Sequence, residues 1–108
     1  MIIFALIVRI IRDLCHKDDP TPALKSFPSE AEIDAALARI VVERDLRDND
    51  WKNSITDLLV VLGIPNMFHY RGGLYNELGG EGQYKGTAEQ NTWMIQQVRH
   101  RFAEGRVD

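Results

Sequence analysis

The chain has 108 residues, which is the length of one ordinary domain. Hydrophobic residues make up 44% of it and charged residues 27%, so the composition allows a folded protein with a real core. The net charge of −3 is unevenly spread: residues 1–17 carry +2, residues 18–50 carry −5, and residues 51–108 balance. Because no segment is strongly basic, the sequence argues against nucleic-acid binding.

Residues that commonly bind metals or form disulfides are few. The single cysteine, Cys15, excludes an internal disulfide and a cysteine-based zinc site, and it fits a reducing compartment. The three histidines, His16, His69 and His100, lie far apart and lack the His-x-x-x-His spacing of a helical metal site. We therefore expect no metal, no cofactor and a cytoplasmic location.

Residues 1–17 predict an apolar N-terminal helix. Its apolar stripe consists of Ile3, Ile7, Ile10 and Leu14. The eight apolar residues before Arg9 are too few to span a bilayer, and the charge and cleavage pattern of a signal peptide is missing. Three alternatives stay open. The helix packs on the domain or on a second copy, it lies at the inner membrane surface, or it is disordered when uncovered. The thin polar face favours packing.

Residues 18–28 form a linker, because Pro20, Pro22 and Pro28 prevent a continuous helix. A second helix is predicted from Ser29, which forms a capping box with Glu32. Its apolar face consists of Ile33, Ala36, Leu37, Ile40 and Val41. A charged connection, residues 44–50, follows it.

The most apolar stretch with clear helix boundaries is 51–63, and we expect it to lie at the centre of the fold. Asp50, Asn53 or Ser54 could cap its start, and Gly63 followed by Pro65 ends it. The predicted core residues of the whole chain are Trp51, Ile55, Leu58, Leu62, Leu74, Leu78, Trp93 and Val98.

A further helix is predicted over 67–78, capped by Asn66, with Met67, Tyr70, Leu74 and Leu78 on its apolar face. The pair Gly72 and Gly73 predicts either a break or a close approach of another segment. Polar and aromatic side chains on its other faces, together with two from the loop that follows, are the candidate ligand-binding residues. These candidates are His69, Arg71, Tyr75, Glu77, Tyr84 and Lys85.

The loop 79–86 is rich in glycine and leads into a final helix over 87–104. Lys85-Gly86-Thr87 has the wrong order for a P-loop, so Gly79 is better explained as a helix cap and the remainder as a flexible turn. Thr87 and Gln90 form a second capping box. The apolar stripe of this helix consists of Met94, Ile95, Val98 and Phe102.

These motifs resemble a family of small bacterial proteins known only as a domain of unknown function, number 3597. Residues 51–63 fit its Trp-x-x-Ser-Ile-x-Asp-Leu-Leu-x-x-Leu-Gly motif, residues 71–79 fit Arg-x-x-Leu-x-x-Glu-Leu-Gly, and residues 91–93 fit Asn-x-Trp. The similarity covers roughly residues 31–104. The chain differs in its shorter, less alanine-rich linker and in the extra glycines around 80–86. The resemblance implies a small all-α domain and supplies no activity.

We predict an all-α fold. A compact domain of four orthogonal or antiparallel helices covers residues 29–105, since the loops between helices are short. The additional apolar helix (1–17) and the linker (18–28) precede it, and a short tail (106–108) follows.

The leading functional hypothesis is a non-enzymatic interaction module that self-associates, docks an unknown protein partner, or contacts a membrane surface through residues 1–14. It rests on the lack of a legible catalytic pair and on an apolar helix that needs to be covered. The alternative is a small glycan- or polar-ligand-binding domain, or a hydrolase. That alternative would use carboxylates near Glu77, with Asp57 and Glu81, and aromatic platforms at Tyr75, Tyr84 or Trp93.

Overall fold

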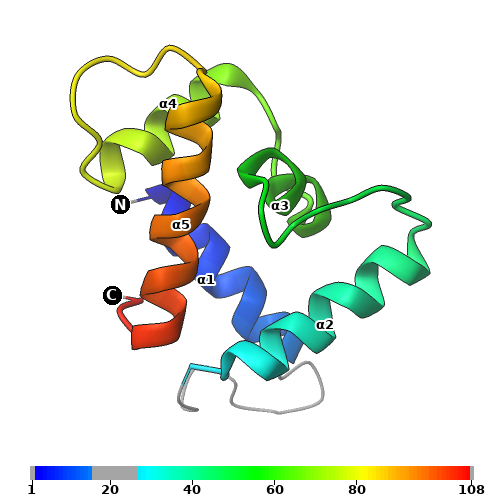
Figure 1. Cartoon of the computed structure of the whole chain (residues 1–108). Coiled ribbons are helices and arrows are strands. Elements are labelled where there is room, and N and C mark those ends of the chain that lie inside the picture. Colours follow the sequence, from blue (N-terminus) through cyan, green and yellow to red (C-terminus); the bar gives the residue numbers. More distant parts are fainter. Residues whose placement is uncertain (1, 16–26, 108) are drawn as a thin grey trace.

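The computed structural model describes residues 2–15 and 27–107, and Figure 1 shows their arrangement. The helices are α1 (Ile2–Cys15), α2 (Glu30–Glu43), α3 (Ile55–Leu62), α4 (Phe68–Glu77) and α5 (Ala88–Glu104). No strand occurs in these residues, which confirms the predicted all-α class. The end predicted for the first helix at residue 17 and most of the predicted linker lie outside the described residues.

α1 is built into the core of this domain. Its side chains Phe4, Ile7 and Ile11 are at most 1% exposed. The helix packs against α2, α3 and α4, and the ring of Phe4 stacks on Phe102 of α5 at a centroid distance of 6.2 Å. In Figure 1 it runs from the end of α4 to the start of α2. Packing on the domain is thus the one of the three alternatives that the structure adopts, and the helix is no appendage.

The buried face of α1 differs from the predicted stripe. Of the four predicted residues only Ile7 is fully buried, whereas Ile3, Ile10 and Leu14 are partly buried. Phe4, Val8 and Ile11 complete the buried face. The buried residues differ from the predicted stripe because α1 is covered from more than one side. Several neighbouring helices, rather than one, determine which of its side chains are buried.

The glycine pair in α4 permits close packing, and the helix runs through it without a break. A Cβ at Gly73 would lie 2.8 Å from Cδ1 of Ile3, and one at Gly72 would lie 3.3 Å from the ring of Tyr84. Of the two predicted alternatives, close approach is therefore the one observed. The approaching atoms belong to the side chains of Ile3 and Tyr84.

The capping boxes predicted at Ser29 and Thr87 are both present. The backbone N–H of Glu32 donates to Ser29 Oγ at 3.2 Å, and that of Gln90 donates to Thr87 Oγ1 at 3.1 Å. α4 instead begins after Met67, which makes no side-chain capping bond, so the predicted cap at Asn66 was wrong. Each observed box joins residues only three positions apart, which is why the sequence alone located them.

The central helix is shorter than predicted. α3 begins after Ser54, whose hydroxyl accepts from the N–H of Asp57, and ends at Gly63 with φ +74°. Residues 51–53 form a turn in front of it. The carboxylate of Asp57 accepts the N–H of Asp50 at 2.9 Å, which holds this turn against the helix. Trp51 is still buried, but it reaches the core from the turn and not from the helix.

The core gathers side chains from all five helices. The predicted core residues are buried with one exception, Trp93, which is half-buried. The apolar face predicted for the helix 67–78 fails at its first residue, since Met67 precedes α4 and is 52% exposed, while Tyr75, expected on another face, is 6% exposed. The ring contacts of Tyr75 with Tyr84 and Trp93 explain this exchange, because they fill the space under the 79–86 loop.

Candidate functional site

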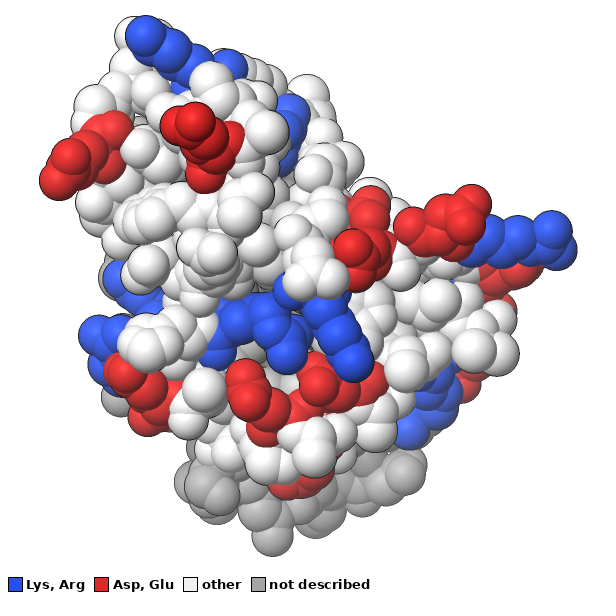
Figure 2. Space-filling model, in the orientation of Figure 1, with Lys and Arg blue, Asp and Glu red and all other residues white. Residues whose placement is uncertain are grey.

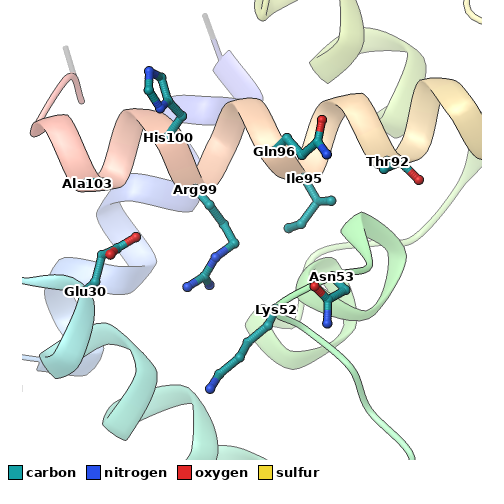
Figure 3. Close-up of a pocket in the computed structure, with 9 residues that line it drawn as sticks. All are labelled: Glu30, Lys52, Asn53, Thr92, Ile95, Gln96, Arg99, His100 and Ala103. Atoms are coloured by element: carbon teal, nitrogen blue, oxygen red, sulfur yellow. The ribbon is translucent and has the colours of Figure 1, made fainter.

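Two of the open pockets formed by the described residues lie along α5, and the larger of these two runs from the middle of the helix towards its end. It has a volume of about 590 Å³ and is shown in Figure 3. One wall is α5, the other is the turn at residues 51–53, and the start of α2 closes one end. We call it the α5 groove. It is lined by Glu30, Lys52, Asn53, Thr92, Ile95, Gln96, Arg99, His100 and Ala103.

Two basic side chains reach into the α5 groove from opposite walls. Arg99 extends from α5 and Lys52 from the turn, and both point into the space between α5 and α2 in Figure 3. His100 points away from Arg99 in the same view, and its Nε2 lies 2.7 Å from Glu104 Oε1. The groove therefore has two cationic groups directed at one volume.

Both basic groups contact the ring of Trp51. The guanidinium carbon of Arg99 lies 5.8 Å from the centroid of the Trp51 ring, and Nζ of Lys52 lies 5.4 Å from it. Arg99 also pairs with Asp34 of α2, with Nη2 3.5 Å from Oδ1. Because Trp51 is only 6% exposed, a residue of the core provides the ring that both surface charges contact.

The charges around the α5 groove are separated by sign. Figure 2 shows basic side chains gathered in the hollow between α5 and α3, with acidic side chains below them near the start of α2. Within the groove, Glu30 is the acidic member. The amide and hydroxyl groups of Asn53, Gln96 and Thr92 add hydrogen-bonding capacity. Such a lining suits a polar ligand whose negative groups each carry a single charge.

Five of the six candidate residues predicted from sequence line neither of these two pockets. His69 is exposed and contacts the ring of Tyr70, while Arg71 lies half-buried over the ring of Tyr84. Tyr84 is buried, and its hydroxyl hydrogen-bonds to Asn91. The candidates are therefore not brought together in one site.

Glu77 and Lys85 have identifiable backbone contacts. Both carboxylate oxygens of Glu77 accept backbone N–H groups of α1, at 2.9 Å from Ile3 and 3.0 Å from Phe4. The side chain of Lys85 is exposed, and its backbone N–H donates to Gln90. Since Asp57 likewise accepts a backbone N–H, two of the three carboxylates named for a hydrolase are engaged in holding the chain.

Tyr75 is the remaining candidate, and it lines the second pocket together with Glu81 and Trp93. These are three of the residues that the sequence proposed for a glycan-binding site. The groove residues Lys52 and Arg99 were missed. In the sequence, Arg99 belongs to a stripe of polar and small residues at positions 92, 96, 99 and 103, which runs along α5 beside its apolar stripe.

The described residues contain neither a metal-binding cluster nor a helix that could span a membrane. Within residues 2–15 and 27–107, no three side chains of His, Cys, Asp or Glu come together as a metal site would need. In that same part of the chain, no helix combines the length and the apolar character that crossing a bilayer requires.

Comparison with known proteins places the chain in a family. Neither the curated proteins nor the solved structures contain a match. A family model described as "Domain of unknown function (DUF3597)" matches residues 12–107, which include the end of α1 and all of α2 to α5. Because the match covers nearly the whole chain and confirms the resemblance seen in the sequence motifs, the protein belongs to the DUF3597 family.

Proposed function

We propose that the protein is a non-enzymatic interaction module that binds an acidic segment of a partner protein in the α5 groove. The observation that carries this proposal is the convergence of Lys52 and Arg99 on one open volume, with both in contact with the ring of Trp51. A site whose charges are already positioned loses less side-chain entropy when a ligand binds.

The composition of the groove favours carboxylates over phosphates. Arg99 already shares its charge with Asp34, and Glu30 stands at one end, so a doubly charged phosphate would meet little net positive charge. A glutamate or aspartate side chain needs only one cation at close range. Asn53 and Gln96 can then hydrogen-bond to the peptide backbone of the partner, as amide side chains commonly do at interfaces.

The sequence-based hypothesis placed the contact with a partner, a second copy or a membrane on residues 1–14. Such a contact would require α1 to leave the core, since Phe4, Ile7 and Ile11 are buried. Separating three large apolar side chains from their neighbours would cost several kcal/mol, at about 1.5–3 kcal/mol for each. The α5 groove is open without any rearrangement, and this supports it as the interaction surface.

The test is a titration of the ¹⁵N-labelled full chain with a hexaglutamate peptide at low and physiological salt. We expect shifts that cluster at Lys52, Asn53, Gln96 and Arg99 and that weaken as salt rises. Lys52→Ala should weaken binding roughly two- to fivefold, which corresponds to ~0.5–1 kcal/mol.

The matched control is Lys85→Ala, since Lys85 is an exposed lysine outside the groove. Arg99→Gln is a second variant, and its thermal unfolding should be recorded because Asp34 loses its partner. Equal affinities of the Lys52→Ala and Lys85→Ala variants, or shifts confined to α1, would overturn the proposal. Sedimentation of the full chain with anionic liposomes in place of peptide binding would instead support the membrane alternative.

A further inference from the structure

The second open pocket lies at the other end of α5 and has a volume of about 420 Å³. Its walls come from the end of α4, the 79–86 loop and the first turns of α5. The lining residues are Tyr75, Gly79, Glu81, Glu89, Gln90 and Trp93. None of them lines the α5 groove, so this pocket is a separate site.

The wall formed by the loop is fixed by hydrogen bonds to both neighbouring helices. The hydroxyl of Tyr75 donates to the carbonyl of Glu81 at 2.7 Å. The side chain of Gln90 donates to the carbonyl of Gln83 at 3.0 Å and accepts the N–H of Lys85 at 2.7 Å. The sequence predicted a flexible turn here, but these contacts hold the loop against α4 and α5. The pocket is therefore formed before any ligand arrives.

An aromatic wall and two carboxylates define the chemistry of this pocket. Trp93 is half-buried and meets the ring of Tyr75 edge-on, at 5.3 Å between centroids and 66° between planes. Glu81 and Glu89 are exposed, and within residues 2–15 and 27–107 neither has an ion-pair partner within 4 Å. No lysine or arginine lines the pocket. An indole beside unpaired carboxylates attracts a cation.

We propose that this pocket binds an arginine side chain of a partner protein. A guanidinium is planar and weakly hydrated, so it can stack on the indole of Trp93 while its N–H groups bond to a carboxylate. Glu81 on the loop and Glu89 on α5 supply carboxylates from two different walls. A lysine ammonium is more strongly hydrated and lacks a flat face, which makes it the poorer fit. The carboxylates favour a cation, and the aromatic wall favours the flat guanidinium of arginine over the ammonium of lysine.

The test uses the ¹⁵N-labelled full chain and three blocked tripeptides, in which glycines flank arginine, lysine or citrulline. Citrulline keeps the shape of arginine and loses the charge. We expect the arginine peptide to shift the indole N–H signal of Trp93, lysine to bind several-fold more weakly, and citrulline about tenfold more weakly. The signal is assigned with the Trp93→Phe variant.

Substitutions of the two carboxylates test whether the arginine peptide binds in this pocket. Glu81→Gln combined with Glu89→Gln should weaken the arginine peptide about fivefold or more, and the exposed Glu43→Gln should leave it unchanged. Equal binding of citrulline, or an arginine response that survives the double variant, overturns the proposal. The same holds if no peptide shifts Trp93 while a chitin trisaccharide does, since the aromatic wall would then serve a sugar ring. Lys52→Ala must not alter the result, because Lys52 lies in the α5 groove.

Discussion

Arg99 stands over the ring of Trp51, with its guanidinium carbon 5.8 Å from the ring centroid. Trp51 belongs to the core, whereas Arg99 lines an open groove on the surface. The position of the Arg99 side chain therefore depends on the packing of Trp51. A substitution of Trp51 should change ligand binding in the α5 groove as well as the stability of the fold.

The first prediction separates these two roles of Trp51. Trp51→Leu should lower the free energy of unfolding by about 2–3 kcal/mol, because a large buried ring is lost. It should also weaken binding of the hexaglutamate peptide, since Lys52 and Arg99 lose the face on which they rest. Trp51→Phe keeps an aromatic face and should restore part of the affinity. Urea unfolding and the peptide titration together measure both effects, and undiminished affinity in Trp51→Leu would contradict the coupling.

The second prediction concerns the carboxylate of Glu77, which caps α1 from a distant part of the chain. The first N–H groups of a helix have no partner within it, and Glu77 supplies acceptors to Ile3 and Phe4. Glu77→Ala should therefore cost about 1–2 kcal/mol of stability in urea unfolding. The exposed acid Glu43 is the matched control, and its change to alanine should stay within about 0.5 kcal/mol. Similar losses in the two variants would contradict a capping role.

The third prediction tests whether α1 is essential to the core. Ile11 is 1% exposed, so Ile11→Ala should cost about 2–4 kcal/mol. Ile2 on the same helix is 83% exposed, and Ile2→Ala should be nearly neutral. A chain that begins at residue 16 should lose cooperative thermal unfolding, measured by circular dichroism. A cooperative transition in that shortened chain would instead support the prediction that residues 29–105 fold without α1.

The fourth prediction compares two glycines. A Cβ at Gly80 would lie 2.3 Å from the ring of Tyr75, which is buried and held by its hydrogen bond to the carbonyl of Glu81, so Gly80→Ala should cost about 1–3 kcal/mol. A Cβ at Gly73 meets only the end of the Ile3 side chain, at 2.8 Å. The gain in helix propensity, about 1 kcal/mol, offsets that shift, and Gly73→Ala should be nearly neutral. Thermal unfolding of the two variants tests this prediction. A lower melting temperature for Gly73→Ala than for Gly80→Ala would contradict it.

The fifth prediction uses the thiol of Cys15. Burial raises its pKa, the Glu32 carboxylate raises it further, and Arg39 opposes them more weakly. Alkylation by iodoacetamide at pH 8 should therefore be slower in the folded chain than in urea. Because the folded pKa is the higher one, the contribution of the neutral thiol to stability is complete below the unfolded pKa and is lost as the pH rises through the folded pKa. Cys15→Ala should lose less stability than the natural chain between pH 7 and pH 10.

Features set by neighbours in sequence were predictable. The capping boxes at Ser29 and Thr87 involve residues three positions apart, and the αL glycine at Gly63 follows its helix directly. The sequence did not decide which of three residues, Asp50, Asn53 or Ser54, caps the start of α3. The choice of Ser54 depends on Asp57, which ties the preceding turn to the helix through the N–H of Asp50.

Features that combine distant segments were not predictable from one sequence. The α5 groove joins Glu30, Lys52 and Arg99 from three separate segments, and no local pattern sets their separation. An apolar stripe on α1 fits a domain core, a second copy or a lipid surface equally well. Tyr75 and Tyr84 looked like surface residues because their burial depends on how the 79–86 loop folds over α4.

The place of α1 in the core has a consequence for synthesis of the protein. α1 leaves the ribosome before α2 to α5, yet the carboxylate that caps it belongs to Glu77, 74 residues after Ile3 and at the end of α4, against which α1 packs. Until the ribosome has translated α4, the nascent chain carries an apolar helix with its start uncapped and its buried face open to water. That interval is when chaperones would be expected to act on this protein, and a pause in translation before α4 would lengthen it.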